Sequence, residues 1–138
     1  MSAGDSVHEH GMRVRREVLG DEHVDAAVAR TTAFTADFQE LITRYAWGGE
    51  IWNRPGLDRK TRSCITLTAL MARGQLEELE MHVEAALRNG LTEDEIEEVL
   101  LQGAIYCGVP AANAAFAVAQ RVLANYDESP EARQGGPK

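Results

Sequence analysis

The sequence predicts an all-α protein, a single-domain helical bundle. Alternation of apolar and polar residues, the pattern of a half-buried strand, never persists, whereas apolar residues recur at helical intervals. Glycine, proline and capping residues also divide the chain into helix-sized segments. At 138 residues, with 44% hydrophobic and 26% charged residues, the chain suits one globular domain and is too short for two ordinary ones.

The first part of the chain predicts three helices. Residues 12–19 form a short amphipathic stretch that Gly20 ends, and residues 23–30 form a second short helix. Thr35 can cap a third helix, which Gly48 and Gly49 end. The apolar residues of this third helix fall at the i, i+3, i+4 and i+7 positions of one face: Phe38, Leu41, Ile42 and Tyr45.

A turn separates these helices from the next two. Residues 53–56 read Asn-Arg-Pro-Gly, in which Pro and Gly are turn residues. Asp58 can then cap a strongly apolar helix that runs to Arg73 and Gly74. A helix over residues 75–87 follows, with an apolar stripe on one face, and Asn89-Gly90 closes it.

The clearest helix start lies at Thr92. Thr92 and Glu95 have the spacing of a capping box, and Leu91 and Ile96 have that of a hydrophobic staple. This helix continues to Cys107. Residues 108–110, Gly-Val-Pro, break it and allow the proline to begin another helix.

The last predicted helix, residues 111–126, has alanine at seven positions. Small side chains permit close helix packing, either inside the core or across a subunit boundary. Because alanines offer little bulk to fill a private core, we expect a homo-oligomer. Residues 1–10 are expected to be a flexible segment, residues 11–126 the domain and residues 127–138 a disordered tail.

Charge and composition exclude several classes of partner. The formal net charge of −8 argues against nucleic acid and anionic membranes, which require a broad basic face. No apolar stretch nears the length that spans a bilayer, and the N-terminus lacks the pattern of a signal peptide, so we expect a cytoplasmic location. An anionic ligand would need a local basic pocket.

One segment, residues 44–62, combines cations with large aromatic residues. Its five Arg and Lys side chains oppose two acidic ones, a local charge of five minus two, or +3, and it contains both tryptophans. Guanidinium groups beside rigid aromatic walls suit a planar anionic ligand. The alternative is that the arginines are solvated and the tryptophans fill the core. The candidate substrate-binding residues are Arg44, Tyr45, Trp47, Trp52, Arg54 and Arg62.

His82 is the candidate general acid. It lies at the border of the apolar stripe of its helix, with Glu78 one turn earlier on the same face. A carboxylate at this spacing can fix the tautomer of an imidazole and favour its protonated form. The alternative is a half-buried structural histidine.

Metal and thiol chemistry are not indicated. The four histidines lack metal-ligand spacing, so we expect neither a metal nor another cofactor. Cys64 and Cys107 are far apart in sequence and form no CxxC motif. Both are expected to be buried, reduced thiols.

Several long strings resemble the carboxymuconolactone decarboxylase family, within the alkylhydroperoxidase D-like superfamily. The resemblance spans about residues 11–123, most of the predicted helical part. The strings that carry it are residues 15–20, RREVLG; 34–39, FTADFQ; 41–48, LITRYAWG; 52–58, WNRPGLD; 61–70, TRSCITLTAL; 81–90, MHVEAALRNG; and 104–115, AIYCGVPAANAA.

This resemblance implies an all-α fold that assembles into rings, commonly trimers or hexamers. It implies cofactor-independent decarboxylation of 4-carboxymuconolactone, a dicarboxylate lactone, to 3-oxoadipate enol-lactone in the protocatechuate branch of the β-ketoadipate pathway. In this reading arginines of residues 44–62 bind the carboxylate and the lactone oxygen, aromatic residues exclude water, and His82 with Glu78 delivers the proton.

Two other functions remain open on the sequence. One is a thiol-dependent peroxidase or reductase on the same fold. Redox members of the superfamily have a CxxC motif and then, after three intervening residues, a His. Aligning that His with His82 puts Gln75 and Glu78 at the cysteine positions, and the glutamate preceding the motif falls at Ser63. The other is a non-catalytic anion-binding module in which His82 is structural.

Overall fold

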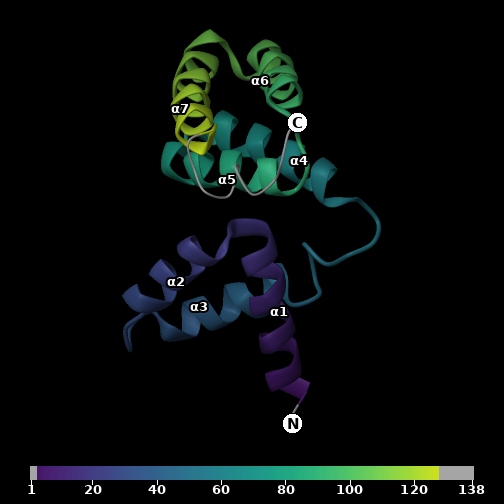
Figure 1. Ribbon diagram of the computed structural model, residues 1–138, viewed down its shortest axis with the longest axis vertical. Coiled ribbons are helices and arrows are strands. Elements are labelled where there is room, and N and C mark those ends of the chain that lie inside the picture. The colour runs from purple at the N-terminus through teal and green to yellow at the C-terminus, as the bar shows by residue number, and fades with distance from the viewer. Residues whose placement is uncertain (1–2, 128–138) are drawn as a thin grey trace. The chain divides into compact units, whose positions relative to one another are not determined.

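The computed structural model describes residues 3–127, and all the regular structure in that range is helical (Figure 1). The all-α prediction is confirmed. The chain divides after Arg62 into two compact units, where the sequence suggested one bundle. None of the helices in the described range is long and apolar enough to cross a membrane.

The first unit contains α1 (Ala3–Leu19), α2 (Asp21–Arg30), α3 (Ala36–Ile42) and the π-helix η1 (Thr43–Trp47), which continues α3. Helix α1 begins well before residue 12, so residues 3–10, expected to be flexible, are helical. The π-helix was not predicted. It ends at Gly48, where the sequence placed the end of this helix.

Helix α1 packs closely against η1 at Gly11. A Cβ atom at Gly11 would collide with the carbonyl oxygen of Thr43 and lie 3.0 Å from Cα of Gly48. Only glycine therefore allows the two backbones to approach this closely. The contact also explains how α1 tolerates a glycine in its interior, since packing offsets the low helix propensity of that residue.

The two tryptophans form the aromatic centre of the first unit. The Trp47 and Trp52 rings stack with centroids 5.2 Å apart and an interplanar angle of 19°. Their side chains are 6% and 8% exposed. The backbone N–H of Trp52 donates to the carbonyl of Ala46 at 2.9 Å, which fixes the loop after η1 over the ring of Trp47. Both residues thus fill the core, the alternative role that the sequence allowed.

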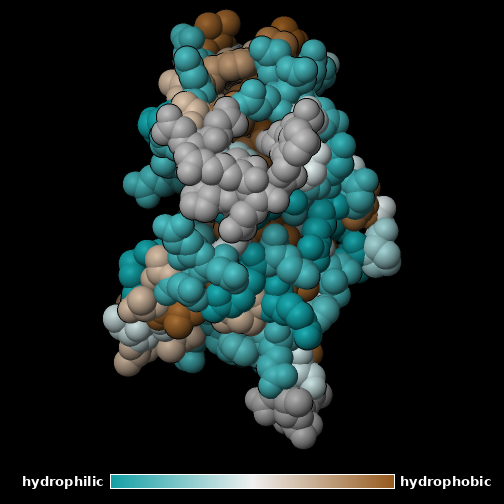
Figure 2. All heavy atoms as spheres, viewed as in Figure 1, coloured by the Kyte–Doolittle hydropathy of each residue, from teal (hydrophilic) through white to brown (hydrophobic). Residues whose placement is uncertain are grey.

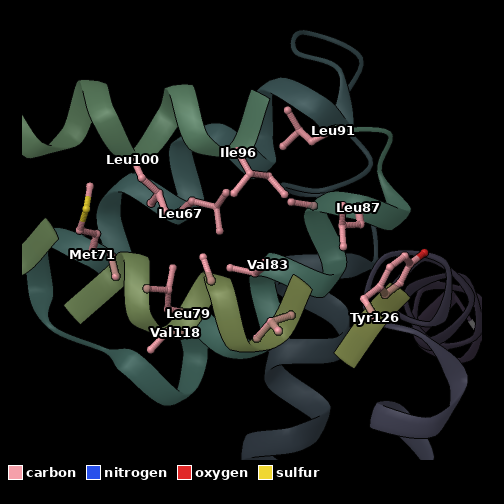
Figure 3. Close-up of a cluster of buried hydrophobic side chains, with 14 residues drawn as sticks. Leu67, Met71, Leu79, Val83, Leu87, Leu91, Ile96, Leu100, Val118 and Tyr126 are labelled. Atoms are coloured by element: carbon pink, nitrogen blue, oxygen red, sulfur yellow. The ribbon is translucent and has the colours of Figure 1, made fainter. Parts of the chain in front are cut away.

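The second unit contains most of α4 (Arg59–Arg73), together with α5 (Leu76–Arg88), α6 (Glu93–Cys107) and α7 (Val109–Asp127). Helix α7 packs against both α5 and α6. Apolar side chains from the four helices meet in one cluster (Figure 3). Its largest fully buried members are Leu67, Met71, Leu79, Val83, Ile96 and Leu100.

The predicted caps of the second unit are confirmed. The N–H of Glu95 donates to Oγ1 of Thr92 at 3.1 Å, and the N–H of Thr92 donates to Oε1 of Glu95 at 3.0 Å. Leu91 and Ile96 are both buried, as a hydrophobic staple requires. Gly108, at φ 96°, separates α6 from α7.

The alanine-rich face of α7 is used inside the second unit. Ala112, Ala115 and Ala119 are 6%, 0% and 3% exposed and pack with Val118 and Val122. This face is therefore not left open for another copy of the chain. Helix α7 continues to Asp127, and the tail predicted beyond it lies outside the described residues.

We predict that Gly11→Ala lowers the free energy of unfolding by about 1–3 kcal/mol, because the added methyl group must push α1 away from η1. Gly56→Ala is the control, since a Cβ there has no atom within 4 Å. Urea unfolding of the two variants measures the difference. Equal stability would contradict the proposed close packing.

Asp58 caps α4, as predicted, and its carboxylate accepts the N–H of Thr61 at 2.7 Å. The bonds from Thr61 lower the pKa of Asp58 below its usual value. A lowered folded-state pKa stabilises the fold above the unfolded pKa, and this stabilisation disappears as pH falls through the folded value. We therefore predict that Asp58→Ala destabilises the protein near neutral pH and that its deficit shrinks at acid pH. A deficit that does not change with pH, measured by urea unfolding across that range, would contradict this cap.

Candidate active site

The predicted site residues belong to different units. Arg44, Tyr45, Trp47, Trp52, Arg54 and Arg62 lie in the first unit, and Glu78 and His82 lie in the second.

The π-helix presents Arg44 and Tyr45 on the surface. Tyr45 is 60% exposed, and both side chains line a hollow of about 550 Å³ in the first unit. A wider turn of this kind displaces side chains from regular helical positions, and π-turns are frequent at functional sites. The other lining residues are Val7, Asp37, Glu40, Leu41 and Glu50.

Carboxylates surround Arg44 in this hollow. One arginine faces three acidic residues, so the formal charge of the lining is one minus three, or −2. The Nε atom of Arg44 lies 4.0 Å from Oε1 of Glu40, whose Oε2 lies 2.6 Å from Nδ1 of His8. This charge balance argues against Arg44 as the receptor for an anionic substrate.

The other arginines of the segment differ in setting. Arg54 is exposed, while Arg62 is half-buried and donates from Nη2 to the backbone carbonyl of Arg54 at 3.2 Å. Arg62 follows the Asp58 cap in the first turn of α4. Arg59 on the same turn pairs with Glu17 of α1 at 3.2 Å. Within residues 44–62, Arg62 is the arginine whose guanidinium bonds to the backbone of the loop before α4.

Sequence reasoning missed one buried cation, Arg15. Its side chain is 5% exposed, with Nη1 donating to Oγ1 of Thr43 at 3.3 Å and Nη2 to Oε1 of Gln39 at 3.2 Å. Burial away from water lowers the pKa of Arg15. The available signal was its helical position, one turn after Gly11 and between Val14 and Val18, where an apolar residue is normal.

His82 is buried in the second unit, and Glu78 is exposed. The imidazole of His82 is 9% exposed on α5, beside the buried Leu79, Val83 and Ala86. Glu78 lies one turn closer to the start of α5. A second buried polar group, Ser63 of α4, accepts a hydrogen bond at 2.8 Å from Nδ2 of Asn89 at the end of α5.

Two other hollows lie in the second unit. A groove of about 450 Å³ between α6 and α7 has Glu93, Asp94 and Glu97 along it, which does not suit an anion. Cys64 borders an apolar hollow with Ile65, Thr68 and Ala69. Cys64 and Cys107 are half-buried, more accessible than predicted, and form no disulfide within the described residues. Within residues 3–127, no cluster of His, Cys, Asp and Glu could hold a metal ion.

Comparison with known proteins identifies the family. The family model described as "Carboxymuconolactone decarboxylase family" matches residues 36–121. The chain is 44% identical to a 4-carboxymuconolactone decarboxylase of Acinetobacter baylyi, over 90% of this chain and 92% of that protein. It is 45% identical to a nitrosuccinic acid decarboxylase of Metarhizium robertsii, over 83% of this chain and 80% of that protein. The chain belongs to the carboxymuconolactone decarboxylase family.

Proposed function

We propose that this protein is a cofactor-independent, cytoplasmic carboxy-lyase that converts 4-carboxymuconolactone to 3-oxoadipate enol-lactone and CO₂, in the protocatechuate branch of the β-ketoadipate pathway. The observation that carries this proposal is the 44% identity to a 4-carboxymuconolactone decarboxylase along nearly the whole of both chains.

The substrate supplies its own electron acceptor. The leaving carboxylate is attached to the ring carbon that is γ to the lactone carbonyl, across a C=C bond. When CO₂ leaves, the electron pair of the broken C–C bond is delocalised as a dienolate onto the carbonyl oxygen. Protonation of the carbon α to the carbonyl then gives the enol-lactone. The protein must bind the retained carboxylate, exclude water and deliver one proton.

Nitrosuccinic acid is a second candidate substrate, because the relative with 45% identity bears that name. Both compounds have the leaving carboxylate and a carboxymethyl group on the same carbon, and both can place the resulting charge on an acceptor, a lactone carbonyl or a nitro group. The shared part of the two substrates is therefore a succinate skeleton. A site for that skeleton accounts for both activities within one family.

We assign proton delivery to His82. A buried imidazole on a well-packed helix can be held in one orientation, which a general acid requires. Glu78, one turn earlier, is the carboxylate of α5 that would favour the protonated ring. Arg62, Arg54 and Tyr45 remain candidates to contact the lactone, whereas the burial of Trp47 and Trp52 gives them a supporting part in shaping the first unit.

The deciding experiment adds 4-carboxymuconolactone to the purified protein and follows the loss of ultraviolet absorbance and the release of CO₂. Nitrosuccinate is assayed in parallel, and kcat/KM is compared for the two compounds. We expect faster decarboxylation of the lactone. Turnover of a hydroperoxide with a thiol reductant in place of decarboxylation, or ligand binding without turnover of either acid, would overturn the proposal.

We predict that His82→Gln leaves a folded protein and reduces kcat for decarboxylation at least about 100-fold, the usual scale for loss of a general acid. Steady-state kinetics together with circular dichroism provide the measurement. His23→Gln, at a half-buried histidine of α2, is the control and should retain wild-type kinetics. Near-normal turnover in folded His82→Gln would show that another group delivers the proton.

We also propose that the protein is a homo-oligomer, a trimer or hexamer. Large apolar side chains are exposed in each unit, among the hydrophilic residues of the surface (Figure 2). In the second unit they gather where α6 ends and α7 begins, a concentration that marks an interaction surface. The exposed fractions there are 47% for Leu101, 79% for Ile105, 81% for Tyr106 and 69% for Val109.

We predict that sedimentation equilibrium at about micromolar concentration gives the mass of three or six chains. Ile105→Glu should shift this distribution toward smaller species, because assembly would bury the new charge. Gln120→Glu adds the same charge at an exposed position of α7, about three turns beyond Val109, and serves as the control. A fully active wild-type monomer would contradict the proposal.

A further inference from the structure

Arg15 is a buried cation whose hydrogen-bond partners are both neutral. Its guanidinium donates to the hydroxyl of Thr43 and the amide oxygen of Gln39, and within residues 3–127 no carboxylate bonds to it. The adjacent Arg16 shows the usual arrangement, with Nη1 lying 3.1 Å from Asp21 and 2.8 Å from Asp25. The more accessible arginine thus has two counter-ions, whereas the buried one has none among the described residues.

This arrangement is costly for the unliganded fold. Removing a guanidinium from water carries a large penalty that neutral acceptors offset only in part. The lowered pKa of Arg15 reflects the same loss of hydration. Residues that lower the stability of the folded state are expected chiefly at functional positions.

The guanidinium of Arg15 can still donate to a stronger hydrogen-bond acceptor. Their lengths, 3.3 and 3.2 Å, exceed the roughly 2.7–2.9 Å of a guanidinium–carboxylate bond. A guanidinium has five N–H donors, and the buried Nε of Arg15 has no hydrogen-bond partner within the described part of the chain. Thr43 is 1% exposed, whereas Gln39 is half-buried. The edge of the Arg15 guanidinium that bonds to Gln39 is therefore the edge nearer to solvent.

We propose that Arg15, with Gln39 and Thr43, forms the receptor for the retained carboxymethyl carboxylate of the substrate. The identity of this ligand rests on the proposed function, in which every candidate substrate has that group. The leaving carboxylate is a poorer match, because a buried guanidinium would stabilise its charge in the ground state and oppose the loss of CO₂. The retained carboxylate keeps its charge throughout, so Arg15 contributes uniform binding.

The kinetic test uses Arg15→Met, Gln39→Glu and a matched control. Loss of uniform binding raises KM and leaves kcat nearly unchanged, and loss of a charge-assisted bond of this kind corresponds to about a 10- to 100-fold rise in KM. Arg15→Met removes the charge at similar volume, and Gln39→Glu gives Arg15 an internal carboxylate that competes with the substrate. Arg13→Met removes an exposed charge from the same helix and should keep the wild-type KM.

The unfolding temperature and KM of the variants together distinguish a carboxylate receptor from a purely structural arginine. If Arg15 only joins α1 to α3 and η1, Arg15→Met lowers the unfolding temperature and keeps the wild-type KM. As a receptor, Arg15→Met has an unchanged or higher unfolding temperature, because an apolar residue replaces an uncompensated charge. Gln39→Glu is expected to raise the unfolding temperature as well. If Arg15→Met does not fold, Gln39→Glu decides, and its wild-type KM would overturn the proposal.

Succinate provides a test that does not need turnover. It should raise the unfolding temperature of the wild type and of Arg13→Met above that in sodium chloride of equal ionic strength, and should not do so for Arg15→Met or Gln39→Glu. This result without decarboxylation would refute the proposed reaction and support the carboxylate receptor. Decarboxylation with the same KM in wild type, Arg15→Met and Gln39→Glu would support the reaction and overturn the receptor.

Discussion

The first unit depends on the close approach of α1 to the π-helix at Gly11. Because no side chain stands between the two backbones, the carbonyl of Thr43 can lie against α1 and Arg15, one turn later, can reach both Thr43 and Gln39. The wide turn of η1 then directs Arg44 and Tyr45 outward and Trp47 inward onto Trp52. One glycine contact thus sets both the aromatic packing and the polar contacts of this unit.

The parts of the fold that could be predicted are those with local causes. Asp58, the Thr92–Glu95 capping box and Gly108 act through bonds or dihedral angles within a few residues, so their effects are visible in the sequence. The π-helix and the early start of α1 could not be predicted in this way. Both depend on packing at Gly11, which joins residues far apart in the chain and reverses the ordinary preference against a helix glycine.

The site was harder to predict because charge and burial are set by distant neighbours. Counting charges along residues 44–62 found a basic segment, but Arg44 meets Glu40, and Arg59 meets Glu17 of another helix. The acidic residues that offset them lie outside the counted stretch. Arg15 was missed for the opposite reason, since in the sequence it stands beside Arg16 and Glu17 and resembles a solvated face.

Four polar or charged residues of the described chain are buried, namely Arg15, Thr43, Ser63 and His82. Thr43 donates to the carbonyl of Gln39 and Ser63 accepts from Asn89, so local bonds account for both hydroxyls. The two titratable members of this set are a guanidinium in the first unit and an imidazole in the second. Burial lowers the pKa of the Arg15 guanidinium, and a carboxylate bound beside it would favour the charged form again.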